Sequence, residues 1–91
     1  MKKHYIAVLV PQPTGEWRAY LPDFPDCRAT GATPAEAVDK SRLSARQLIA
    51  GRKQDELPHP RSLGAIQDDR DWASKRAIEW DSAVISLVGL D

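Results

Sequence analysis

Two prolines spaced three residues apart, Pro22 and Pro25, separate two segments that have the alternating pattern of β-strands. In the first segment, Trp-Arg-Ala-Tyr-Leu, the side chains at every second position would lie on one face of a sheet. Proline has no N–H for the hydrogen bonds of a sheet, so Pro22 ends this strand and Pro25 stiffens the turn that follows. We therefore expect one strand over residues 16–21 and an antiparallel neighbour over residues 27–32.

The residues after the second of these strands are typical of the start of a helix. Thr33 is a favoured N-cap, Pro34 suits the first helical position, and Glu36 stands where a carboxylate reaches back to the cap. This capping box predicts a helix that continues to about Ala50 and ends at Gly51. At 100° per residue, one side of the helix should pack on the sheet. That side comprises Ala37, Val38, Ser41, Ala45, Leu48 and Ile49.

The remaining segments complete a small α+β fold. Residues 5–10 are aliphatic with few breaks, which indicates a strand covered on both faces. Short helices are expected over residues 62–67 and within 68–80, and a fourth strand over residues 83–90. The three N-terminal strands form a meander, and the crossover rule predicts a fourth strand parallel to the first, in the sheet order 3-2-1-4. With the long helix on one face, this architecture is similar to part of the ribonuclease H fold.

Composition favours a soluble globular protein. The chain has 91 residues, of which 42% are hydrophobic and 29% charged, enough for one domain over residues 1–91. The longest apolar run, around residues 6–10, is too short to cross a membrane, and the single cysteine suits a reducing cytoplasm. The two histidines lie far apart with no acid at ligand spacing, so we expect no metal and no cofactor.

The carboxylates are poorly placed for catalysis. A metal-dependent nuclease of the ribonuclease H type needs acidic side chains on its central strands to hold two cations. The predicted first strand carries no acid, and the final strand carries none before Asp91. The acids gather instead in the turn at residues 22–26 and around residues 68–71, so we expect no enzyme activity and no catalytic residues.

The turn at residues 22–26 is the candidate surface for a protein partner. We expect Phe24 to be exposed there between two aspartates, as an aromatic anchor with acidic acceptors that suit a basic partner. Leu43, which points away from the predicted core, is a further candidate contact. The predicted partner-binding residues are Tyr20, Asp23, Phe24, Asp26 and Leu43. The alternative interpretation is a stiff turn that only fixes strand register.

Nucleic-acid binding is a second possible role. Two groups of residues combine positive charge or aromatic rings as phosphate contact and base stacking require. They are Arg42, Arg46 and Lys53 along the long helix, and Trp72, Lys75, Arg76 and Trp80 further on. Thirteen basic residues balance thirteen acidic ones, whereas dedicated nucleic-acid binders are usually strongly basic. A solvated helix surface and tryptophans that cover the sheet are therefore favoured.

The same segments resemble the signature of the HicB antitoxin family. The residues W-R-A-Y-L-P-D-F-P-D-C over 17–27 are followed by G-A-T-P-A-E-A over 31–37, by P-H-P over 58–60 and by a terminal apolar strand. The glycine that the family has before the cysteine is Asp26 here, a residue type that tolerates a left-handed backbone. The resemblance implies a partial ribonuclease-H-like fold.

The resemblance also implies a function. HicB proteins neutralise HicA, a small RNA-cleaving toxin, by covering its active site, and many carry a C-terminal segment that binds operator DNA. This chain stops directly after its last predicted strand, so we expect one HicB-like domain, without a DNA-binding domain and without operator binding. The prediction is a cytoplasmic antitoxin-like module for a HicA-like toxin. The alternative is an orphan nucleic-acid-binding or self-associating scaffold, and pairing of the third or fourth strand predicts a homodimer or higher homo-oligomer.

Overall fold

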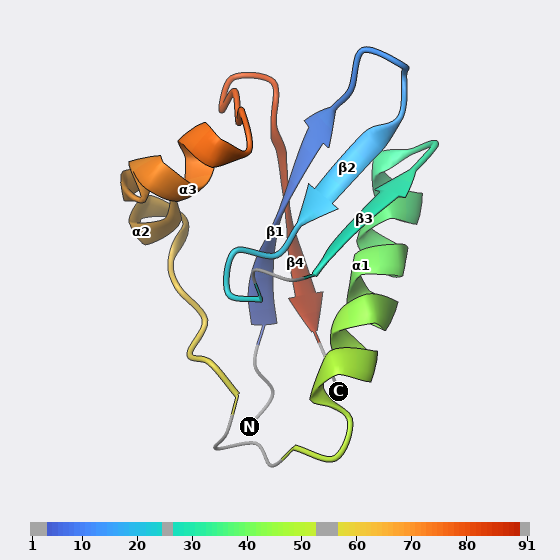
Figure 1. Ribbon diagram of the computed structural model, residues 1–91, viewed down its shortest axis with the longest axis vertical. Helices are drawn as coiled ribbons and strands as arrows, with labels where there is room; N and C mark the ends of the chain where they lie inside the picture. Colours follow the sequence, from blue (N-terminus) through green and yellow to red (C-terminus); the bar gives the residue numbers. More distant parts are fainter. Residues whose placement is uncertain (1–3, 25–26, 53–56, 90–91) are drawn as a thin grey trace.

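The computed structural model of the chain describes residues 4–24, 27–52 and 57–89. Within these residues a sheet of four strands has the order β3-β2-β1-β4, and helices cover both of its faces (Figure 1). The strands are β1 (His4–Pro11), β2 (Trp17–Tyr20), β3 (Arg28–Gly31) and β4 (Val84–Gly89). The helices are α1 (Pro34–Ile49), α2 (Leu63–Asp68) and α3 (Arg70–Lys75). The α+β class, the crossing helix and the predicted strand order are confirmed.

The predicted direction of the last strand is wrong. β4 pairs antiparallel with β1, with His4 opposite Gly89 and Leu9 opposite Val84. The crossover rule gives the handedness of a connection between parallel strands, and it does not require that a returning strand be parallel. Here the segment that begins at Leu57 first runs back along the sheet to α2 and α3, so β4 enters from the opposite end (Figure 1).

The strand β1 is buried on both faces, as its aliphatic run predicts. Alternate side chains of β1 join two separate apolar clusters, one on each side of the sheet. Tyr5, Ala7 and Leu9 belong to the cluster under α1, and Ile6, Val8 and Val10 to the cluster under α2 and α3. The sheet is therefore the middle of three layers, with α1 on one side and the two short helices on the other (Figure 1).

The helix α1 begins where the capping residues predict. The Thr33 hydroxyl accepts the backbone N–H of Glu36 at 3.1 Å, while the Glu36 carboxylate pairs with Lys40 at 3.0 Å. Gly51, with φ at 84°, follows the end of the helix. Leu48 differs from the prediction because it is exposed rather than packed on the sheet. Ala37, Ser41 and Ala45 are fully buried, and these small side chains let α1 lie close to the strands.

The two short helices cover the other face with aromatic side chains. Ser62 caps α2 and Asp69 caps α3, each through a side-chain oxygen that accepts a backbone N–H three residues on. Trp72 is buried, and its ring lies 6.4 Å from that of Trp80. In the part of the chain that the structure describes, no helix is long and apolar enough to cross a membrane.

Candidate functional site

The turn that follows β2 points its aromatic residue inward, which corrects the expectation that Phe24 is exposed. Phe24 is only 4% exposed, and its ring packs edge-on against Tyr5 with centroids 4.8 Å apart. Two backbone hydrogen bonds close the turn, from Phe24 N–H to the Leu21 carbonyl at 2.9 Å and from Cys27 N–H to the Phe24 carbonyl at 2.8 Å. The turn thus places the ring in the core under α1, and Cys27 is buried as expected.

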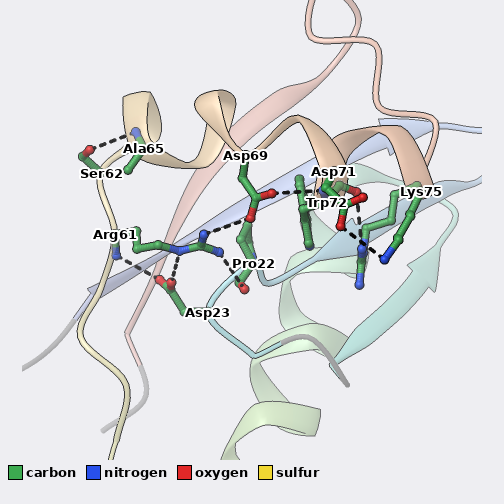
Figure 2. Close-up of polar contacts among 10 residues, drawn as sticks. Pro22, Asp23, Arg61, Ser62, Ala65, Asp69, Asp71, Trp72 and Lys75 are labelled. Carbon is green, nitrogen blue, oxygen red and sulfur yellow. Dashed lines mark hydrogen bonds and ion pairs between the residues drawn. The ribbon is translucent and has the colours of Figure 1, made fainter.

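Asp23 is bound inside the protein rather than presented to a partner. Its side chain is 3% exposed, and Arg61 donates to it twice, from the backbone N–H at 3.1 Å and from Nε at 2.8 Å (Figure 2). The guanidinium of Arg61 also donates to the Pro22 carbonyl at 2.9 Å. The hydrogen bond to Asp23 raises the pKa of Arg61, although burial acts in the opposite direction. This pair fixes the turn to the segment that precedes α2.

Arg61 links the turn to α3 as well. Its Nη1 lies 3.4 Å from Asp69 Oδ2, while Asp69 Oδ1 accepts the N–H of Trp72 at 3.1 Å and so caps α3 (Figure 2). The guanidinium of Arg61 therefore connects the turn to the cap of α3. Its partner in the turn, Asp23, lies 38 residues earlier in the sequence. These contacts indicate a structural role for the acidic turn.

The five predicted partner-binding residues do not form one surface. Tyr20 is buried on the other face of the sheet from Phe24, where its ring lies 6.1 Å from that of Trp72. Asp26 lies outside the described residues. Leu43 is 57% exposed on the outer side of α1, as predicted. Of the five residues, Leu43 is thus the one that the structure places on an open surface.

The edge strand β4, which the sequence analysis expected to be able to pair with another copy, carries exposed apolar side chains that were not among the predicted partner-binding residues. Among the described strands, β4 pairs with β1 alone, so its outer edge is open. Val84, Ile85 and Leu87 are all exposed, with Leu87 at 64%. Because side chains alternate along a strand, Val84 lies on the α1 face and the other two on the opposite face. A strand with apolar side chains on both faces and an open edge is a favourable site for another protein.

A shallow hollow next to β4 extends this surface onto α1. Its lining is mainly apolar and comes from Leu9, Pro34, Ala35, Val38, Asp39, Val84, Ile85 and Ser86. We call β4 and this hollow the β4 surface. The run of apolar residues at 83–88 was a signal for it, because a strand at a sheet edge has less cover than a central strand.

Several residues of the two groups that the sequence suggested for nucleic-acid binding make contacts within the protein instead. Arg42 pairs with Asp39 at 3.2 Å on the helix surface, and Lys53 lies outside the described residues. Trp72 is buried and therefore presents no face for a base. The tryptophans cover the sheet, as the favoured interpretation predicts.

The strands β1 and β4 contain no carboxylate. Among the residues that the structure describes, no group of three or more histidine, cysteine, aspartate or glutamate side chains is arranged to hold a metal ion.

Comparison with known proteins identifies the fold. No protein-family model matches the sequence, and no curated protein proved similar to it. The structure, however, is similar to the crystal structure of the N-terminal domain of Burkholderia pseudomallei antitoxin HicB. The TM-score is 0.69 at 15% sequence identity, over 97% of this chain and 98% of that chain. The chain has the fold of a HicB N-terminal domain. The resemblance predicted from the motifs is thus confirmed at the level of the fold.

Proposed function

We propose that this chain is an antitoxin-like protein-binding module that neutralises a HicA-type RNA-cleaving toxin by covering its active site, and that it is not itself an enzyme. The observation that carries the proposal is the match to an antitoxin domain over nearly the whole of both chains. The absence of carboxylates from β1 and β4 agrees with a binding role, since a nuclease of related fold would need acids there.

The toxin docks at the β4 surface. Leu87, Ile85 and Val84 can be covered by a partner, which would remove apolar area from water at about 25 cal/mol per Å². The open edge of β4 adds backbone N–H and C=O groups that a partner strand can pair.

Electrostatics favour this edge of the sheet over the other one. A toxin that binds RNA must carry basic side chains, and the opposite edge presents Arg18 and Arg28, which would repel it. In the β4 surface the one charged lining residue of the hollow, among the residues that the structure describes, is Asp39, which pairs with Arg42, and β1 separates β4 from the strands that carry the two arginines. Leu43 remains a proposed contact because it is exposed on α1.

Growth rescue tests the proposal. A HicA-type toxin is expressed with the wild-type chain, with Leu87→Arg at the β4 surface, or with Leu43→Arg at the proposed contact on α1. Leu48→Arg, at an exposed leucine outside the proposed contacts, is the control and should rescue growth. We expect rescue by wild type and loss of rescue with Leu87→Arg, because a charge at the β4 surface must be desolvated on docking. No rescue by wild type would contradict the toxin partner, and loss with Leu43→Arg alone would move the docking site to α1.

A self-associated form is a second candidate because the same edge can pair with a copy of itself. Two β4 strands would join into a continuous sheet and bury Leu87 and Ile85 of both copies. We propose a homodimer in the absence of toxin. Light scattering should give a dimer mass for wild type and a monomer mass for Leu87→Arg, whereas a monomeric wild type would refute the homodimer.

A further inference from the structure

A second surface lies on the face of the sheet that α2 and α3 leave uncovered at β2 and β3. In the pairing of these strands, Tyr20 lies opposite Arg28 and Arg18 opposite Thr30. Side chains of paired residues lie on the same face, so both arginines share the face of Tyr20. Diagonal neighbours on adjacent strands are roughly 7–8 Å apart, which brings Arg18 and Arg28 within reach of one ligand.

A third arginine reaches the same place from the end of α3. The Arg76 guanidinium lies 5.1 Å from the centroid of the Trp72 ring and 6.0 Å from that of Tyr20, and its Nη1 donates to the Trp72 carbonyl at 3.3 Å. The rings hold this guanidinium in place, so less side-chain entropy is lost when it binds a ligand. Arg18, Arg28 and Arg76 line one open hollow of about 480 Å³.

The guanidinium groups of these three arginines form no ion pair with a carboxylate among the described residues. The ion pairs in this part of the chain involve other lysines and arginines. Within the described part of the chain, the side chain of Arg18 donates to the Tyr20 hydroxyl, at a long 3.4 Å. Lys75 at the edge of the hollow pairs with Asp71 at 3.2 Å, and Glu79 lies where the hollow extends toward the loop after β1. A chain with a net charge of zero therefore concentrates positive charge on this face.

We infer that Arg18, Arg28 and Arg76 bind the phosphodiester backbone of a nucleic acid, a role beyond the proposed toxin docking. Guanidinium groups match phosphate oxygens in charge and geometry. The hollow is open, and two further hollows also include Arg18 in their lining, which suits an extended chain of phosphates. Tyr20 and Trp72 are buried and offer no face for stacking, so recognition is through the backbone and independent of base sequence.

Fluorescence anisotropy with labelled single-stranded RNA and DNA of about 12 nucleotides tests this site. The variants are Arg18→Gln, Arg28→Gln and both together. The control is Arg42→Gln with Arg52→Gln, which changes the net charge equally. Arg42 lies on α1, which packs on the other face of the sheet, and Arg52 follows this helix. We expect the double variant to bind about tenfold more weakly than wild type and the control to bind within about twofold.

Salt dependence gives a second readout. Between about 50 mM and about 200 mM salt, each lost phosphate contact should lower the slope of log affinity against log salt by about 0.7 for a single strand. Equal binding by wild type and the double variant, or equal losses in the control, would overturn the inference. Displacement of RNA by polyglutamate as readily as by unlabelled RNA would overturn the assignment to phosphodiesters.

The two proposals can fail separately. Arg18 and Arg28 lie two and three strands away from β4, so Arg18→Gln with Arg28→Gln should still rescue growth in the toxin assay. Circular dichroism of the same variants should match wild type, because both side chains are exposed.

Discussion

At the scale of single residues, Arg61 does more to join the parts of this protein than any position in the conspicuous turn. It pairs with Asp23, which is almost wholly buried. Its guanidinium also donates hydrogen bonds to the Pro22 carbonyl and to one oxygen of the Asp69 carboxylate. A buried carboxylate that loses its cation keeps the desolvation penalty without the compensating attraction. The stability of the turn therefore depends on the contact between Asp23 and Arg61, which lie 38 positions apart in the sequence.

Replacing Arg61 should destabilise the fold strongly. Arg61→Met leaves Asp23 buried without its partner, and we expect the free energy of unfolding to fall by about 3 kcal/mol, the lower end for a buried pair because Arg61 is one-third exposed. Urea denaturation followed by circular dichroism measures the loss. Lys40→Gln, which removes an exposed pair with Glu36, is the control and should cost less than about 0.5 kcal/mol. Equal effects of the two substitutions would contradict this role for Arg61.

Tyr5 predicts how stability changes at high pH. Burial first, and the negative charge of Asp23 second, raise the pKa of the Tyr5 hydroxyl above its ordinary value of 10.0. The unfolded chain then loses this proton at a lower pH than the folded one, so the stability is complete below about pH 10 and falls as the pH rises toward the folded pKa.

The control for that pH effect is Tyr5→Phe, which also loses the 2.7 Å hydrogen bond to the Pro58 carbonyl, at a cost of about 1 kcal/mol near neutral pH. Urea denaturation at about pH 8 and about pH 11 should show a steeper fall for wild type than for the variant. Parallel pH profiles would rule out a titrating Tyr5.

The burial of Phe24 and Asp23 could not be predicted from the turn sequence. The prolines and the alternation before them fix where the strand stops, and that prediction is close to the observed end at Tyr20. The direction of a side chain in a turn depends on its tertiary contacts. Here Phe24 packs against Tyr5, and Asp23 pairs with Arg61. Neither contact leaves a local signal in the sequence.

At the scale of elements, periodicity and capping located every helix and strand, but they did not determine the direction of β4. Thr33, Ser62 and Pro22 are local signals, and the structure agrees with each of them. The direction of β4 depends on the path of the chain after α1, which has no periodic pattern. The predicted sheet order already placed this strand at an edge that could pair with another copy, but its exposed apolar side chains were not among the predicted partner-binding residues.

Gly31 shows how closely α1 approaches the sheet. A Cβ at this position would lie 2.6 Å from the backbone nitrogen of Ala37 and 3.0 Å from the carbonyl carbon of Glu36. Because backbone atoms cannot move aside as a flexible side chain does, Gly31→Ala should lower the free energy of unfolding by about 2–3 kcal/mol.

The matched control is Gly64→Ala in α2, where a Cβ would meet no atom of the described structure within 4 Å. This substitution should stabilise the protein by about 0.5 kcal/mol, because alanine favours a helix over glycine. Thermal denaturation of both variants distinguishes them, and a harmless Gly31→Ala would show that α1 does not pack as closely as described.

At the scale of the whole molecule, the two edges of the sheet have different chemistry. The β4 edge is apolar on both faces, and the β3 edge carries Arg28 beside Arg18 on the face that the short helices leave open. A net charge of zero conceals this division, which is why composition argued against nucleic-acid contact. The strand β1 separates β4 from the strands that carry Arg18 and Arg28.

Inhibition of toxin ribonuclease activity by the purified chain tests the central claim most directly. RNA cleavage by the HicA-type protein is followed while the chain is added in increasing amounts. Our account predicts that cleavage stops near an equimolar ratio with wild type and continues with Leu87→Arg, which cannot cover the active site from the β4 surface. Undiminished cleavage in the presence of excess wild-type chain would contradict it.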